Sequence, residues 1–279
     1  ALARHGRNGA QILLTSNDLA SRQRYLNARN TLNTLLSWNV LPIINENDTV
    51  AVEEIRFGDN DNLAALITLL MDADILINLT DIDGLYDKDP RQHSDAALIT
   101  DVSRITKKME AAASSIPGAL GTGGMMSKLK AARKLMAAGV PMIIANGCQK
   151  HILADLAAGT PRGTFFQPRD HKLSSKKRWI AFGQKPQGVL TVDPGAANAL
   201  KKRGKSLLPG GITSVKGEFG VGALVEIRTT GGKTFASGLV NYSATDIQAI
   251  KGLKTNQIKK MLGQKPYDEV VHRDNLVLT

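Results

Sequence analysis

The chain has 279 residues, 42% of them hydrophobic, with a formal net charge of +11 and one cysteine, which is enough for a large and a small domain with real cores. No run of 18 apolar residues and no secretion signal is present, so we expect a cytoplasmic protein without a membrane-spanning helix. The lone cysteine excludes an intramolecular disulfide, and the five scattered histidines lack zinc-ligand spacing, so no protein metal site is expected.

The positive charge is confined to the C-terminal part of the chain. Residues 1–170 contain 18 Lys and Arg against 18 Asp and Glu, whereas residues 171–279 contain 18 against 7. This asymmetry predicts two parts with different partners.

The first part alternates short apolar runs with longer helical patterns, which is typical of a parallel sheet covered by helices. We expect strands at 11–14, 40–44, 75–79 and 141–145. We expect helices at 21–37, 60–71 and 125–138, the last ended by Gly139. The predicted class is α/β.

The second part begins after a break in this pattern. We predict a domain over 1–170, a polar and basic linker over 171–185 and a second domain over 186–279. Apolar and β-branched runs with glycine turns predict strands at 189–192, 214–215, 223–228 and 234–240, with one helix at 196–202. Such short strands indicate a small β-rich barrel or sandwich.

Two polar clusters flank the predicted strand at 40–44 and the helix after it. Residues 45–48 (NEND) follow the strand, and residues 58–62 (GDNDN) precede the apolar part of the helix. Polar side chains at the carboxyl ends of strands bind ligands in open α/β sheets. Carboxylates for an ammonium and amides for a carboxylate suit an amino-acid pocket, although Asx turns and an N-cap at Asp59 or Asn60 would account for the same residues.

A third motif, GTGGMMSK at 121–128, leads into the helix at 125–138. Its glycines let backbone N–H groups approach an anion, the helix N-terminus favours negative charge, and Lys128 lies where it can reach a phosphate. The spacing differs from that of a P-loop, and a flexible loop before a helix is the structural alternative. Thr80 and Asp81, at the end of the strand at 75–79, are candidate partners for the same nucleotide.

Signatures of a protein nucleophile and base are missing from the sequence: G-x-S-x-G, H-E-x-x-H and the kinase catalytic loop H-R-D-x-x-x-x-N do not occur. A carboxylate substrate is itself the nucleophile toward ATP. Phosphoryl transfer can then proceed by positioning, Mg²⁺ and cationic groups alone.

The motifs NENDTVAVEEIRFGDNDNLAAL, LTDIDGLYDKDP and GTGGMMSKLKAA, in this order, resemble the glutamate 5-kinases of the amino-acid kinase superfamily. The stretch GVLTVDPGAANALKKRGKSLLPGGI resembles the PUA domain of bacterial members. The resemblance covers essentially the whole chain. It implies a three-layer α/β/α kinase domain with a mainly parallel sheet, ATP with Mg²⁺, proline biosynthesis in the cytoplasm, homo-oligomers and feedback inhibition by proline.

The resemblance also implies roles for individual residues. Glutamate is expected to be bound by Asp48 and Asn60, with Asn45, Asp59 and Asp61 lining the pocket, and the catalytic group is Lys128 with Asp59 and Asp61. The expected nucleotide contacts are Thr80, Asp81, Thr122, Gly123, Gly124, Met125, Met126, Ser127 and Lys128.

The family's opening segment, which carries a phosphate-binding lysine and a Ser-Gly-Ala loop, has no counterpart in these residues. We therefore expect this chain by itself to be slower, by about a hundredfold or more, than an enzyme with the complete set of charges. Two other interpretations remain open: an amino-acid kinase of different substrate, and an RNA-binding protein whose kinase half is a relic.

Overall fold

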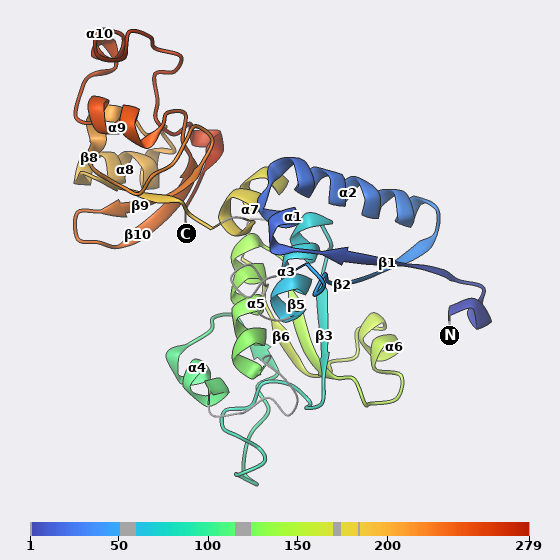
Figure 1. Cartoon of the computed structure of the whole chain (residues 1–279). Helices are drawn as coiled ribbons and strands as arrows, with labels where there is room; N and C mark the ends of the chain where they lie inside the picture. The colour runs from blue at the N-terminus through green and yellow to red at the C-terminus, as the bar shows by residue number, and fades with distance from the viewer. Residues whose placement is uncertain (1, 51–59, 115–123, 170–173, 184, 279) are drawn as a thin grey trace. The chain divides into compact units, whose positions relative to one another are not determined.

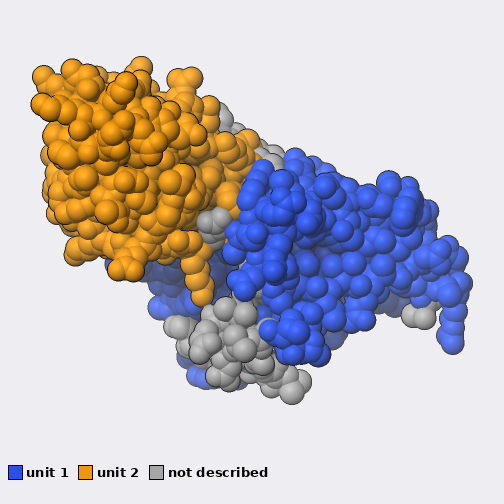
Figure 2. Space-filling model, turned by 45° about the horizontal axis from the view of Figure 1, so that its top comes forward, with its two compact units in different colours: residues 1–173 blue, residues 174–279 orange. Residues whose placement is uncertain are grey.

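The structure, a computed structural model, describes residues 2–50, 60–114, 124–169, 174–183 and 185–278. The chain divides into two compact units, Ala1–Leu173 and Ser174–Thr279, which Figure 2 shows in two colours. Within the described residues, no helix is both long and apolar enough to cross a membrane.

Unit 1 alternates strands and helices along the chain (Figure 1). Its strands are β1 (Asn8–Leu14), β2 (Val40–Glu46), β3 (Leu76–Thr80), β4 (Asp101–Val102), β5 (Met142–Asn146) and β6 (Thr164–Phe166). Its helices are η1 (Leu2–His5), α1 (Ser16–Ala20), α2 (Arg22–Ser37), α3 (Asn60–Leu70), α4 (Lys107–Ser114), α5 (Met125–Ala138) and α6 (Ile152–Ala157). The expected α/β class is confirmed, because the four expected strands and three expected helices are present with ends shifted by at most three residues.

Most strand pairs of unit 1 are parallel. Strands β1 and β2 form a two-stranded parallel sheet, in register from Asn8 beside Val40 to Leu14 beside Glu46. A four-stranded sheet has the order β3-β5-β6-β4, in which β3 pairs with β5 and β4 with β6 in parallel, and β5 with β6 antiparallel. The carboxyl ends of β3 and β5 therefore lie at the same edge.

Helices α3 and α5 pack against each other, α3 also against β2 and β3, and α5 against β5. Their facing sides are apolar: Leu63 and Leu69 on α3, and Leu129 and Leu135 on α5, are all buried. Helix α5 ends as expected, since Gly139 adopts φ 79° at its C-cap, a conformation that costs other residues more. This packing places the N-terminal turns of α3 and α5 together.

Unit 2 is built around a five-stranded sheet of order β11-β10-β9-β7-β8 with one apolar core. Its strands are β7 (Gly188–Val192), β8 (Ile212–Lys216), β9 (Leu224–Thr229), β10 (Thr234–Leu239) and β11 (Leu276–Leu278). Its helices are α7 (Ser175–Phe182), α8 (Pro194–Arg203), η3 (Pro209–Gly211), α9 (Ala244–Ile250), η4 (Thr255–Gln257), α10 (Ile258–Leu262) and η5 (Arg273–Asn275). The expected small β-rich domain is confirmed.

Part of the segment expected as a linker is a helix. Residues 175–182 form α7, which packs against β10, β11 and η5, with Trp179 and Ile180 buried. The basic residues around this short apolar run conceal a helical pattern, because Lys176 is exposed and Lys177 half-buried whereas Arg178 is buried together with the apolar residues.

Candidate functional site

The centre of the candidate site is an ion pair between the first turns of two helices. The Lys128 Nζ atom, on α5, lies 3.1 Å from both carboxylate oxygens of Asp61, on α3. The side chains are 13% and 11% exposed. Two opposite charges this far from water stabilise one another strongly, and removing one would leave the other uncompensated.

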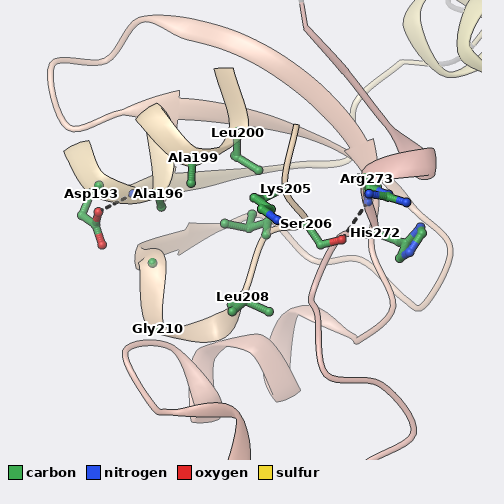
Figure 3. A pocket seen from close by; sticks show the side chains of 13 residues that line it. Asp193, Ala196, Ala199, Leu200, Lys205, Ser206, Leu208, Gly210, His272 and Arg273 are labelled. Atoms are coloured by element: carbon green, nitrogen blue, oxygen red, sulfur yellow. Dashed lines mark hydrogen bonds between the residues drawn. The ribbon is translucent and has the colours of Figure 1, made fainter. Parts of the chain in front are cut away.

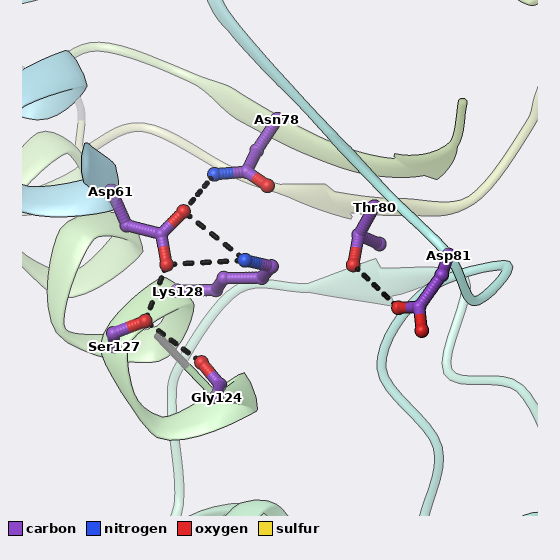
Figure 4. A network of polar contacts seen from close by, with 7 residues as sticks. All are labelled: Asp61, Asn78, Thr80, Asp81, Gly124, Ser127 and Lys128. Atoms are coloured by element: carbon purple, nitrogen blue, oxygen red, sulfur yellow. Dashed lines mark hydrogen bonds and ion pairs between the residues drawn. The ribbon is translucent and has the colours of Figure 1, made fainter. Parts of the chain in front are cut away.

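Two further donors complete the carboxylate's shell (Figure 4). Asn78 Nδ2, on β3, donates to Asp61 Oδ1 at 2.6 Å, and Ser127 Oγ donates to Asp61 Oδ2. The Ser127 hydroxyl also lies 2.8 Å from the carbonyl oxygen of Gly124, and its one proton can serve only one of these acceptors at a time. Three side chains, two from α5 and one from β3, thus hold one carboxylate of α3.

The N-terminus of α5 lies at this cluster. Gly124 is its N-cap, with extended backbone, and Ser127 and Lys128 follow within the first turn. Met125 is buried and Met126 half-buried. The first N–H groups of a helix have no partner within it, and with the helix dipole they favour an anion. A phosphate is the anion that this arrangement suits.

Thr80 and Asp81 lie at the carboxyl end of β3, and Thr80 Oγ1 donates to Asp81 Oδ1 at 3.2 Å. Thr80 is two residues beyond Asn78 on the same strand, so the two side chains face the same side, about 7 Å apart along the strand. Since Asn78 reaches Asp61 on that side, Thr80 faces the same region of the site.

A second polar cluster follows β3 and β5. Asn146 Nδ2 and Gln149 Nε2 donate to Asp83 Oδ1 at 3.0 and 2.9 Å, and the Tyr86 hydroxyl donates to Asp83 Oδ2 at 3.3 Å. Burial raises the pKa of the Tyr86 phenol, and the charge and hydrogen bond of Asp83 raise it further. Asp83, Asn146 and Gln149 line a cleft of about 690 Å³. The Asp83 carboxylate is thereby fixed beside the loop that begins at Thr80.

Three of the residues that are predicted to bind the glutamate substrate are exposed. Asn45 is the last but one residue of β2, Asp48 lies in the turn after it, and Asn60 is the first residue of α3. Helix α3 packs against β2, which brings these ends into one neighbourhood, but no hydrogen bond among the described residues joins the three side chains to the Asp61 cluster. The other predicted residues, Asp59, Thr122 and Gly123, lie outside the described part of the chain.

Asn78 is the residue of this cluster that the sequence interpretation missed. It is buried, with 9% of its surface exposed, in an otherwise apolar stretch. A single amide inside an apolar strand is the signal that could have found it, because a buried polar side chain requires a partner.

Unit 2 contains a groove of about 660 Å³ between α8, η3 and η5. Its wall is largely apolar or small, including Ala196 and Leu208. Figure 3 shows Lys205, His272 and Arg273 toward one end and Asp193 at the other. The groove therefore offers an apolar surface beside a cationic end.

Comparison with known proteins assigns both units to families. The model of the amino acid kinase family matches residues 1–146, and the model of the PUA domain matches residues 188–262.

Several relatives match nearly the whole chain. A glutamate 5-kinase of Syntrophus aciditrophicus is 52% identical over 278 residues, which are 100% of this chain and 72% of that protein. Glutamate 5-kinases of Caldanaerobacter subterraneus and Geobacter sulfurreducens are 52% and 50% identical, over 98% of this chain and 74% and 73% of theirs. The chain therefore belongs to the glutamate 5-kinase family, with an amino-acid kinase domain followed by a PUA domain.

Proposed function

We propose that the chain transfers the γ-phosphoryl group of ATP to the side-chain carboxylate of L-glutamate, giving L-glutamyl 5-phosphate and ADP, the first step of proline biosynthesis. The observation that carries the proposal is the buried Lys128–Asp61 pair at the N-terminus of α5, in a chain about half identical to named glutamate 5-kinases. ATP and glutamate are intracellular metabolites, so we place this reaction in the cytoplasm.

In this reaction a glutamate carboxylate oxygen attacks the γ-phosphorus, and the bond from that phosphorus to the bridging oxygen breaks with ADP leaving. The attacking carboxylate is already ionised at neutral pH, so no protein base has to remove a proton. Lys128 is assigned to the transferring phosphoryl group, where its ammonium stabilises the charge that develops on the oxygens. Asp61 holds that ammonium in place through both oxygens.

Substrate binding is assigned to the residues around the pair. Asp48 offers a carboxylate for the substrate ammonium, and Asn45 and Asn60 offer amides for its α-carboxylate. The nucleotide is assigned to the end of β3 and to the start of α5 with the residues before it, namely Thr80, Asp81, Thr122, Gly123, Gly124, Met125, Met126 and Ser127. Asp59 is assigned to the glutamate pocket. Ser127 is assigned to the nucleotide through its backbone N–H, since its hydroxyl already donates to Asp61.

Magnesium is proposed to arrive with ATP. Among the described residues, no group of three His, Cys, Asp or Glu side chains could hold a metal ion by itself, and the Asp61 carboxylate is occupied by its three donors. These residues fit a metal held mainly by nucleotide phosphates, which would neutralise their charge when bound.

The test is a hydroxylamine trap for acyl phosphate, with this chain, ATP and a panel of amino acids. Glutamate should give the strong signal, and the Lys128→Ala variant should lose it while Lys130→Ala, an exposed lysine on the same helix, keeps it. Equal signal with aspartate would refute the substrate assignment.

For unit 2 we propose a role in regulation or assembly, with the enzyme a homo-oligomer inhibited by proline. Every residue assigned to the substrates lies between Asn45 and Lys128, and therefore in unit 1. A change in proline inhibition or in oligomer size on removing unit 2 would support this role.

RNA binding is the second candidate for unit 2, favoured by its groove and its excess of basic residues. Lys205 and Arg273 lie where phosphates could be met, but charge alone gives binding that salt weakens steeply. Binding of one RNA that persists at raised salt and is lost in a Lys205→Ala, Arg273→Ala double variant would establish it. Binding that disappears with salt and does not depend on RNA sequence would exclude a specific role.

A further inference from the structure

Within the described residues, Asn78 is the member of the Asp61 cluster that comes from the sheet. Lys128 and Ser127 both lie on α5, and Asp61 lies on α3. Asn78 lies in the middle of β3, where its backbone pairs with Ile144 of β5. Its amide therefore ties the ion pair to the sheet, whereas the other contacts tie one helix to the other.

Asn78 also shares its strand with a residue assigned to the nucleotide. Thr80 lies two residues further on and faces the same side of β3. The separation between Thr80 and the Asp61 carboxylate is set through Asn78, because the strand between them is held by its pairing with β5. A rigid link of this kind fixes where the Lys128 ammonium stands relative to a bound nucleotide.

A buried amide is costly unless its hydrogen bonds are made, so a purely structural strand position would favour an apolar residue. Asn78 instead donates at 2.6 Å to an ionised carboxylate, and hydrogen bonds to charged groups are the stronger kind.

We infer that Asn78 is a positioning residue for phosphoryl transfer, which acts through Asp61 to place the Lys128 ammonium against the transferring phosphate. This inference rests on the proposed function. Asn78 touches neither substrate in this scheme. Its loss should therefore slow the chemical step while glutamate binding stays the same.

The experiment compares the chain with its Asn78→Leu variant, which replaces the amide by an apolar side chain of similar size in the strand. We expect kcat to fall by about 10- to 100-fold, the usual effect of losing a hydrogen bond to a charged group, with the KM for glutamate within about twofold. Lys134→Met is the matched control. It removes the 2.6 Å contact from Lys134 to Asn62 between the same two helices, and kcat should stay within about twofold.

A double-mutant cycle separates positioning from general damage. In an Asp61→Ala background, Asn78→Leu should lower kcat little further, because the acceptor of the Asn78 hydrogen bond is already gone. Two outcomes would overturn the inference: fold-decreases in kcat that multiply in the double variant, or an unchanged kcat in a folded Asn78→Leu protein. If Asn78→Leu does not fold, the smaller Asn78→Ser, whose hydroxyl is too short to reach Asp61, takes its place with the same expected outcomes.

A second readout does not depend on turnover. Labelling of Lys128 by an amine-reactive acetyl ester, followed by peptide mass spectrometry, should be at least about threefold faster in Asn78→Leu, because a less fixed carboxylate holds the ammonium less firmly. An unchanged labelling rate would count against the positioning role. If the parent chain phosphorylates no amino acid yet the labelling rate rises, the proposed function fails while the link from Asn78 to Lys128 stands.

Discussion

At the scale of single residues, the buried ion pair of Lys128 and Asp61 stands at the centre of the proposed reaction site. Burial of both charges is costly, and an apolar pair of the same volume would often be at least as stable. A charged lysine, unlike an apolar side chain, can stabilise the oxygens of a phosphoryl group in transfer. We therefore propose that the pair serves the chemistry of the site, with the carboxylate holding the ammonium in place.

The first prediction concerns Lys128→Ala. Because its charge is needed mainly as negative charge develops, kcat should fall by about a hundredfold or more while the KM for glutamate changes little. Steady-state kinetics with Lys130→Ala as the control measure both constants. A tenfold rise in KM with an unchanged kcat would contradict the role given to Lys128.

Asp48→Ala should change the KM for glutamate more than it changes kcat, the reverse of Lys128→Ala. Asp48 is exposed in the turn after β2 and outside the Asp61 cluster, so its loss removes a partner for the substrate ammonium and leaves Lys128 in place. We expect the glutamate KM to rise by about tenfold or more with kcat reduced far less. Calorimetric titration with glutamate checks the binding directly, and unaltered affinity would remove Asp48 from the pocket.

At the scale of elements, the sequence predicted those helices and strands whose periodicity is long or whose ends are marked. Helix α5 was predicted with its observed ends, because its apolar face runs for four turns and Gly139 ends it. The short strands β4, β6 and β11 were missed, since two or three residues carry no measurable alternation.

The sequence predicted those residues of the site that lie in recognisable local motifs. Asp61, Ser127 and Lys128 belong to motifs that are dense in polar residues, and the structure brings them together. The contact from Asn78 depends on how β3 packs against α3, which is a tertiary relation that local patterns do not encode. Cys148 is exposed and lies two residues beyond the end of β5.

A third prediction concerns the turn that leads into β6. Gly163 has φ 74°, and a Cβ there would lie 2.0 Å from the carbonyl oxygen of Ile144. Gly159 has φ 80° with open space around the same position, so it is a matched control for the backbone conformation. Gly159→Ala should lower the free energy of unfolding by about 1–2 kcal/mol, and Gly163→Ala by clearly more. Urea unfolding measures both, and equal losses would show that the close approach to Ile144 costs nothing.

At the scale of the whole molecule, charge and assigned chemistry are divided between the units. Residues 1–170 are electrically balanced and contain every residue assigned to glutamate and ATP, whereas residues 171–279 hold the whole positive excess. A basic unit raises the local concentration of polyanions without regard to sequence. The two units are thus suited to separate tasks, and one can be removed to test the other.

The last prediction compares two truncations that remove the PUA domain. A chain ending at Leu173 should fold and phosphorylate glutamate at the rate of the full chain, because the unit boundary lies there and the substrate residues remain. A chain ending at Lys185 should aggregate more, because it keeps α7 but removes β10, β11 and η5, which cover Trp179 and Ile180. Light scattering measures the aggregation of both truncated chains, and the hydroxylamine assay measures their glutamate phosphorylation. Loss of all activity in a folded 1–173 chain would show that unit 2 takes part in the reaction. Equal solubility of the two truncated chains would show that α7 does not need the rest of unit 2 to cover its apolar side.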